Sequence, residues 1–363
     1  MVSTKQANID SSRARRYRAS MNRRSVGLWL VTLCVTMIPF RSPAPLVYTP
    51  GEGWTYEPAS GPGKWRRERA KDQLEVAQEA FDQKNYSLSL KAARRVVKVW
   101  PQSDHAPEAQ YLVGRSYEAR GHDERAFTEY QKVIEKYPRS ETVQEVTQRQ
   151  FDIASRYLGG QRFRLWGYIP LYKSMDRTAG MFEKIVQNGP YSEVAPQAQL
   201  RIGAAREKQK HYPEAVKAYD RAADRYHDRP VIASDALYRA GAAYQKQART
   251  AEYDQSAAGQ AVAKFTDFLT LYPDDARKPE AESAIASLKT EQARGNFATA
   301  QFYEKVAHRR EGTQWPEGQN PWKGPLIYYN EVLLKDPNST YAAQARQRID
   351  AIKQRLQTQT ASR

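Results

Sequence analysis

The side chains that most often perform chemistry are few in this sequence and lie far apart. The chain contains one cysteine, Cys34, and five histidines, none of which pair at the spacing of metal ligands. A single cysteine excludes a disulfide framework and a cysteine zinc site. The Gly-x-Ser-x-Gly, His-Glu-x-x-His and Gly-x-Gly-x-x-Gly motifs do not occur. The sequence therefore predicts no catalytic residue, no metal site and no cofactor, and nothing in it recommends an enzyme.

Two groups of acids remain as candidates for acid–base chemistry. The groups are Glu75, Glu79 and Asp82, and Asp123, Glu124 and Glu129. Runs of charge on a helix usually face water, so we interpret both groups as solvated helix surface. His122, at a predicted turn, and His227, at a predicted helix end, are expected to be capping or surface residues.

The 57 basic and 41 acidic residues give a net charge of +16, and 40% of the residues are hydrophobic. This composition excludes a wholly disordered chain. Residues 1–44 hold eight basic side chains and one acid, so this short segment accounts for +7 of the charge. The remaining charge is spread thinly, and a cytoplasmic nucleic-acid binder has only the total in its favour.

The first 44 residues have the order of an export signal. An uncharged run of fifteen residues, Val26–Phe40, follows basic residues and precedes small ones, which is typical of a secretory signal. The run is short for a bilayer span, which needs roughly 20 apolar residues. A start at Met21 gives a signal of ordinary length. Cys34 is a possible lipidation site, and the alternatives are an ordinary cysteine in a signal core and an uncleaved inner-membrane anchor.

The rest of the chain is expected to form a linker, a repeat domain and a short tail. Proline and glycine are dense at 45–65, where neither helix nor continuous sheet is expected. The repeats occupy 66–358, and 359–363 form the tail.

Residues 107–138 carry a helical hairpin with the tetratricopeptide (TPR) pattern of about 34 residues. Gly114 and Ala126 are small and let two helices approach closely, while Tyr117 and Tyr130 fill the space around that contact. Further copies before and after this one predict an all-α, right-handed TPR superhelix of about five to six hairpins plus a closing helix, without a sheet. Insertions at 162–177 and 309–324 interrupt two copies. The tyrosines at packing positions are Tyr117, Tyr130, Tyr157, Tyr219 and Tyr244.

A TPR superhelix offers a groove lined by the first helix of each hairpin, and such a groove binds extended peptides or partner helices. The groove positions that packing leaves free in the amino-terminal half are Gln78, Tyr111, Arg115, Glu118, Gln148 and Phe151. Aromatic, arginine and glutamine side chains suit an extended peptide, whose backbone needs hydrogen-bond partners and whose side chains need pockets.

Three segments resemble the BamD (YfiO) family of outer-membrane assembly lipoproteins: Ala77–Pro101, Phe297–Lys305 and Leu326–Ile349. The resemblance covers about residues 66–350. It implies a place on the periplasmic face of the outer membrane and contact with the barrel-forming BamA subunit through the carboxy-terminal part. It also implies that the protein helps to receive unfolded β-barrel precursors.

The leading hypothesis is therefore a non-enzymatic periplasmic scaffold of outer-membrane protein assembly. Its groove is expected to bind the aromatic-ended carboxy-terminal strands of client barrels. The alternative is a periplasmic TPR adaptor for envelope division or peptidoglycan enzymes, which shares the same fold and location. Neither hypothesis involves nucleic acid.

Overall fold

The computed structural model describes residues 46–49, 53–56, 65–165, 169–250, 255–310 and 320–361. The chain divides into two units, Met1–Lys64 and Trp65–Arg363. The predicted export segment, with Met21 and Cys34, lies outside the described residues, as does most of the insertion at 309–324.

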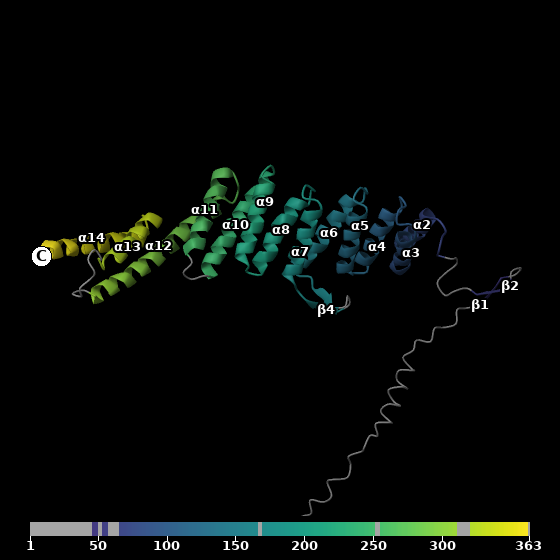
Figure 1. Cartoon of the computed structure of the whole chain (residues 1–363), viewed down its shortest axis with the longest axis horizontal. Coiled ribbons are helices and arrows are strands. Elements are labelled where there is room, and N and C mark those ends of the chain that lie inside the picture. Colours follow the sequence, from purple (N-terminus) through teal and green to yellow (C-terminus); the bar gives the residue numbers. More distant parts are fainter. Residues whose placement is uncertain are drawn as a thin grey trace, which may run out of the picture. The chain divides into compact units, whose positions relative to one another are not determined.

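The second unit is a series of helical hairpins. Its helices are α2 (Ala70–Asp82), α3 (Tyr86–Val99), α4 (Ala106–Ala119), α5 (Asp123–Lys136), α6 (Val143–Leu158), α7 (Met175–Asn188), α8 (Ala195–Lys208), α9 (Tyr212–Arg225), α10 (Pro230–Thr250), α11 (Gln255–Leu271), α12 (Lys278–Arg309), α13 (Lys323–Lys335) and α14 (Thr340–Ala361). Each helix packs mainly on its neighbours in the sequence (Figure 1). The predicted all-α repeat fold is confirmed within the described residues, with six hairpins and a closing helix, α14.

In several hairpins, a glycine of the first helix packs against an aromatic ring of the second helix. Gly203 of α8 faces Tyr219 of α9, and a Cβ atom at Gly203 would lie 2.6 Å from the ring carbon Cδ1. Gly241 of α10 meets Phe265 of α11 in the same way, with 2.9 Å to Cδ1. Both rings are buried. Glycine therefore allows an approach of the two helices that any larger residue prevents.

Tyrosine hydroxyls connect the helices at two recurring places. Tyr219 donates to Glu207 Oε2 across its own hairpin (2.9 Å), and Tyr226 donates to the carbonyl of Pro190 at the end of the preceding hairpin (2.9 Å). The equivalent bonds join Tyr130 to Glu118 and Tyr137 to Pro101. These bonds satisfy the polar ends of largely buried rings, so the aromatic residues can serve as core.

The turn inside the hairpin requires a left-handed backbone. Lys84, Gly121 and Lys210 have φ values of 60°, 69° and 64°, and each lies seven residues after the small residue of its first helix. Glycine adopts this conformation freely, whereas a lysine adopts it at a cost. The repeat therefore imposes the turn even where the sequence lacks glycine.

The expectation that the chain forms no sheet is wrong at two places. In the first unit, β1 (Leu46–Thr49) pairs with β2 (Gly53–Tyr56) in an antiparallel hairpin inside the predicted linker. The strands are rich in β-branched and aromatic residues. Two of the residues that predicted an extended linker, Pro50 and Gly51, lie between the strands in the sequence. In the second unit, β3 (Phe163–Leu165) pairs with β4 (Ile169–Tyr172) within the insertion at 162–177.

Burial corrects one interpretation of the acids. Glu75, Glu79 and Asp82 are exposed, but Asp123 is only 7% exposed and forms an ion pair with Arg156 (3.1 Å). Of the five tyrosines expected in the core, four are buried; Tyr244 is partly buried and packs against the core. The described helices include none long and apolar enough to span a membrane.

Candidate functional site

The groove candidates occupy equivalent positions of successive first helices. Tyr111 and Phe151 each lie three residues before the small residue of their helix, Gly114 or Ala154. Gln78 and Arg115 lie one residue after that small residue, Glu118 lies four after it, and Gln148 lies six before it. One face of α2, α4 and α6 therefore carries all six side chains.

The structure unites three of the six candidates and leaves the other three apart. Tyr111, Arg115 and Glu118 belong to one hydrogen-bonded network. Gln78 instead donates to Glu108 (2.6 Å), and the exposed Gln148 donates to Asp152 on its own helix (2.9 Å). Phe151 packs edge-on against Phe182 of α7, with 5.8 Å between ring centroids.

The Tyr111 hydroxyl is the centre of that network. It donates to Glu145 and accepts hydrogen bonds from Arg149 Nε (2.8 Å) and Arg115 Nη1 (3.2 Å). Arg149 also pairs with Glu118 (3.5 Å). Each group thus already has partners within the protein, so this end of the face is a closed polar network.

The pKa shifts of the network's tyrosines and of Glu145 fit groups that are hydrogen-bonded to one another. Burial and the hydrogen bond to Glu145 raise the pKa of Tyr111. Burial opposes ionisation of Glu145, but hydrogen bonds from Tyr111 and Arg149 lower its pKa. Burial together with Glu118 raises the pKa of Tyr130 far above its ordinary value. At neutral pH the tyrosines are therefore neutral donors and Glu145 is an anion.

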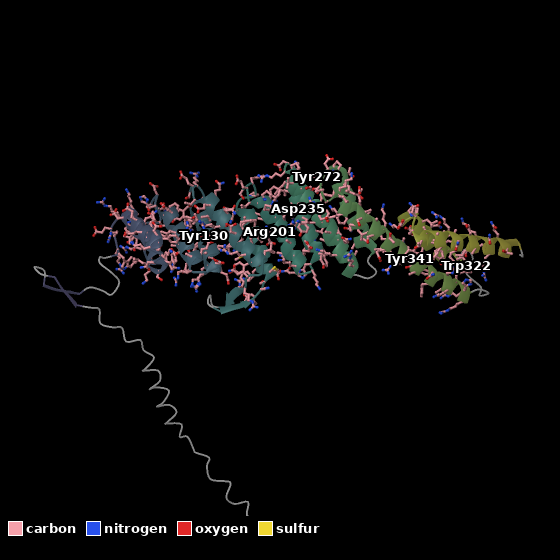
Figure 2. The ribbon with its side chains drawn as sticks, turned by 180° about the vertical axis from the view of Figure 1, so that it is seen from behind. Tyr130, Arg201, Asp235, Tyr272, Trp322 and Tyr341 are labelled. Carbon is pink, nitrogen blue, oxygen red and sulfur yellow. The ribbon has the colours of Figure 1, made fainter. Side chains whose placement is uncertain are left out.

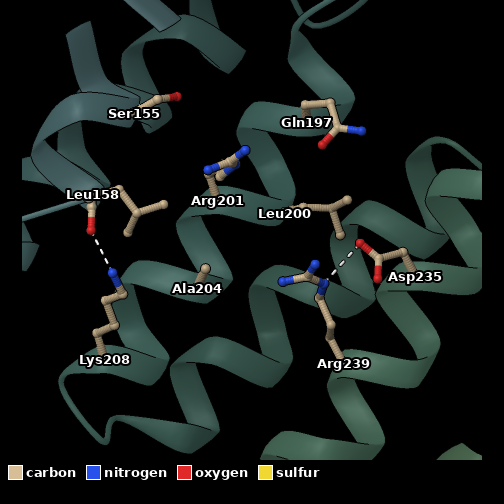
Figure 3. Close-up of a pocket in the computed structure, with 10 residues that line it drawn as sticks. Ser155, Leu158, Gln197, Leu200, Arg201, Ala204, Lys208, Asp235 and Arg239 are labelled. Carbon is tan, nitrogen blue, oxygen red and sulfur yellow. Dashed lines mark hydrogen bonds and ion pairs between the residues drawn. The ribbon is translucent and has the colours of Figure 1, made fainter. Parts of the chain in front are cut away.

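A cavity of about 380 Å³ lies further along the same face, between α6, α8 and α10 (Figure 3). Its volume is within the range of ligand pockets. The lining residues are Ser155, Leu158, Gly159, Gln197, Leu200, Arg201, Ala204, Lys208, Asp235 and Arg239. Arg201 and Asp235 mark its place in the middle of the hairpin series (Figure 2). All ten belong to first helices or the residue that ends one.

The cavity combines apolar walls with excess positive charge. Leu158 and Leu200 are almost fully buried. Arg201, Lys208 and Arg239 supply three cations, and Asp235 is the single acid in the lining. Such a lining suits a ligand that carries an apolar group beside a carboxylate.

The cations differ in how far they are already engaged. Lys208 donates to the carbonyl of Leu158 (2.5 Å), and Arg239 pairs with Asp235 (2.8 Å). Arg201 is exposed and lies 5.9 Å from the centre of the Phe151 ring, and no carboxylate among the described residues pairs with it. The buried Ser155 Oγ lacks a hydrogen-bond partner among the described residues. Arg201 is therefore the group best placed to bind a ligand.

Sequence reasoning missed this cavity because it applied the groove positions only to the amino-terminal half. Leu200 is the counterpart of Phe151, Ala204 of Arg115, and Gln197 of Gln148, counted from Gly203. The signal was present in the repeat register. The repeat register gives the position of these residues but does not show that they leave a cavity. The cavity forms because the aliphatic Leu200 and the small Ala204 occupy the positions that Tyr111 and Arg115 occupy in α4.

Asp235 also joins the cavity to the next hairpins through Arg277. Arg277 Nη1 donates to Asp235 (2.8 Å), and its Nε and Nη2 donate to the two carboxylate oxygens of Asp275 (2.9 and 2.7 Å). The guanidinium lies over the rings of Tyr238 (4.9 Å) and Phe268 (5.4 Å). One arginine thereby fixes the start of α12 to α10 and α11.

Acid is expected to weaken this contact. Hydrogen bonds from Arg277 hold the pKa of Asp275 well below its ordinary value. A group with a depressed folded-state pKa stabilises the fold above its unfolded pKa and loses that contribution as pH falls through the folded one. We expect Asp275→Asn to remove on the order of 1 kcal/mol near neutral pH, and to reduce the loss of stability between about pH 4 and 2. Denaturant unfolding at several pH values measures both effects.

Asp274→Asn is the matched control, because Asp274 is exposed and adjacent in the chain. Its unfolding curve should match that of the wild type at every pH. Equal acid sensitivity of the two variants would contradict the role given to Asp275.

Comparisons with known proteins support the interpretation of the fold and of the family resemblance. Residues 172–310 match the YfiO family, described as an outer membrane lipoprotein, and residues 108–140 match a tetratricopeptide repeat family. The resemblance to the BamD (YfiO) family is thus confirmed for the part that contains α8 and α10. Both families are non-catalytic scaffolds of protein–protein interaction. No curated protein matches the chain.

Several solved structures, two of them of TPR proteins, are similar to parts of the chain. The carboxy-terminal part of a TPR protein from Cytophaga hutchinsonii is 14% identical, covers 77% of this chain and 88% of its own, and has a TM-score of 0.34. The pilus biogenesis factor PilW is 13% identical, with 77% and 99% covered and a TM-score of 0.26. A TPR protein of Thermus thermophilus is 16% identical, with 60% and 98% covered and a TM-score of 0.29.

Proposed function

We propose that this chain is a non-enzymatic periplasmic scaffold of outer-membrane β-barrel protein assembly. It docks the barrel-assembly subunit, a BamA-like protein, and binds peptide segments of unfolded client barrels on the face between α6 and α10. The observation that carries the proposal is the cavity that places Arg201 beside Leu158 and Leu200. An aromatic-ended chain terminus offers the complementary chemistry, a carboxylate next to an apolar side chain.

An apolar surface near the carboxy terminus supports the docking of the barrel-assembly subunit. Phe302 and Tyr303 of α12 are 62% and 39% exposed, and Ile327 of α13 is 49% exposed. Tyr303 stacks on Tyr328 with 5.3 Å between ring centroids. Aromatic residues grouped on a surface favour protein interfaces.

The family match supports a location at the periplasmic face of the outer membrane. Two anchors fit the sequence: a lipid on Cys34, or an uncleaved signal in the inner membrane. Metabolic labelling with a clickable fatty acid distinguishes them, because lipidation requires labelled wild-type protein and unlabelled Cys34→Ala protein.

Depletion of the protein followed by outer-membrane proteomics tests the function. We expect β-barrel proteins to decrease, and a pull-down of the tagged full chain from membrane extracts to recover the barrel-assembly subunit. An unchanged outer-membrane profile, with cell-wall enzymes in the pull-down, would replace the proposal with an envelope-enzyme adaptor. Recovery of neither class would remove both functions.

A further inference from the structure

Phe151 of α6 adjoins the cavity without lining it. It lies four residues before Ser155, which does line the cavity (Figure 3), and residues four apart on a helix have Cβ atoms about 5–6 Å apart. The guanidinium of Arg201, another lining residue, lies 5.9 Å from the centre of the Phe151 ring. The ring is partly exposed and meets the ring of Phe182 edge-on. A ligand held by Arg201 is therefore within reach of the Phe151 ring.

The aromatic residues at the same repeat position of α4 and α10 are already engaged within the protein. Tyr238 of α10 donates to Glu280 (2.8 Å), and the guanidinium of Arg277 lies 4.9 Å from the centre of its ring. Tyr111 of α4 belongs to the closed polar network. Phe151 has no hydroxyl to be fixed in this way. Of these three rings, the ring of Phe151 is therefore the one left to meet a ligand.

These contacts give a bound peptide a direction. Its terminal carboxylate meets Arg201, and its last side chain occupies the apolar part of the cavity. On the α10 side the wall is a polar surface, the ion pair of Asp235 with Arg239 (2.8 Å). On the α6 side the ring of Phe151 offers an apolar surface. The preceding residues of the peptide therefore extend over α6.

The geometry of an extended chain decides which of these residues meets Phe151. Side chains alternate between the two faces of such a chain, and each residue adds about 3.4 Å. The side chain two positions before the terminus therefore points to the same face as the last one, about 7 Å away. This spacing suits a ring whose centre lies 5.9 Å from the guanidinium that holds the carboxylate.

We propose that Phe151 determines the specificity of the cavity for the residue two positions before the carboxy terminus, where it selects an aromatic side chain. The inference rests on the proposed function, because it takes the cavity to bind a chain terminus. Two aromatic rings gain stability beyond the area that they bury when they meet edge-to-face or offset. A leucine side chain can pack against Phe151 as well, but it lacks this additional gain.

Two fluorescent peptides test the specificity with the full chain. Both end in phenylalanine with a free carboxylate, and they differ only two positions before the end, where one has phenylalanine and the other has leucine. The wild type should bind the first peptide about threefold to tenfold more tightly. Phe151→Leu should bring the ratio of the two Kd values close to one. Phe302→Leu, at a residue 62% exposed on α12, is the matched control and should keep the wild-type ratio.

Amidated forms of both peptides separate this inference from the proposed function. If the wild type prefers the free acids and Phe151→Leu keeps the wild-type ratio, the role of Phe151 is overturned and binding of the terminus stands. A ratio close to one in the wild type has the same consequence. Equal binding of free and amidated peptides by the wild type overturns the proposed binding of a chain terminus, and the role of Phe151 with it.

A photoreactive peptide tests the direction in the wild-type protein, so this test does not depend on the stability of a variant. The peptide carries benzoylphenylalanine two positions before its end, and mass spectrometry locates the crosslinks. We expect crosslinks on α6, close to position 151. Crosslinks on α10 without any on α6 overturn the direction, and crosslinks spread evenly over many helices overturn a specific contact with Phe151.

Discussion

Gly203→Ala is expected to lower the free energy of unfolding by about 3 kcal/mol, at the upper end of the usual cost of overpacking. The new Cβ atom would overlap the ring of Tyr219, with Cδ1 at 2.6 Å and Cζ at 2.7 Å. The ring cannot move aside, because it is fully buried and its hydroxyl is held by Glu207. The loss should exceed the gain of about 1 kcal/mol that alanine brings to a helix interior. Urea unfolding followed by circular dichroism measures the difference.

Gly180→Ala provides the matched control. Gly180 is also inside a helix, α7, but a Cβ atom there meets nothing within 4 Å. This variant should be as stable as the wild type or more stable by up to about 1 kcal/mol. Tyr219→Leu, which removes the ring, should make a further Gly203→Ala substitution less damaging. Equal stability of Gly203→Ala and Gly180→Ala would contradict the account of hairpin packing.

Arg201→Glu is expected to weaken the binding of an aromatic-ended peptide with a free carboxylate at least about tenfold, or about 1.4 kcal/mol. Reversing this charge places a carboxylate beside the ligand's own in a cavity with apolar walls. The substitution breaks no ion pair with a described carboxylate, so the fold should be unchanged. Fluorescence titration with a labelled synthetic peptide, in the wild type and the variant, gives the ratio of Kd values.

Two controls show whether the effect belongs to the cavity. Arg221→Glu makes the same change of charge at an exposed position of α9, a second helix, and should leave Kd near the wild-type value. The peptide with an amidated end should bind the wild type more weakly than the free acid. Similar weakening by both charge reversals would point to general electrostatic attraction and against a specific site.

The repeat pattern was sufficient to predict the hairpins and their core, because packing in a solenoid is local. The contact between two adjacent helices is formed by Gly114, Ala126 and Tyr130, which all lie in one short stretch of sequence. The left-handed turns at Lys84 and Lys210 also depend on local packing, because the contact between the two adjacent helices fixes the turn without its usual glycine.

The position of the proposed binding face follows from the repeat pattern, whereas its chemistry does so much less. The register correctly placed Tyr111, Arg115 and Glu118 on one face. Their hydrogen-bonding groups are satisfied with the help of Glu145 and Arg149 from the next hairpin. The sequence pattern of a single repeat does not reveal such a contact. The β3–β4 hairpin was equally difficult to predict from the sequence, because its base depends on the contact of Arg177 from α7 with the ring of Phe163 in β3.

Site-specific photo-crosslinking in living cells tests whether the cavity between α6 and α10 receives client barrels. A photoreactive phenylalanine analogue replaces Gln197, an exposed residue that lines the cavity, or Lys217, an exposed residue of α9. We expect adducts with unfolded outer-membrane barrel precursors from position 197 and none from position 217. Absence of such adducts at 197, or equal adducts at both positions, would contradict it.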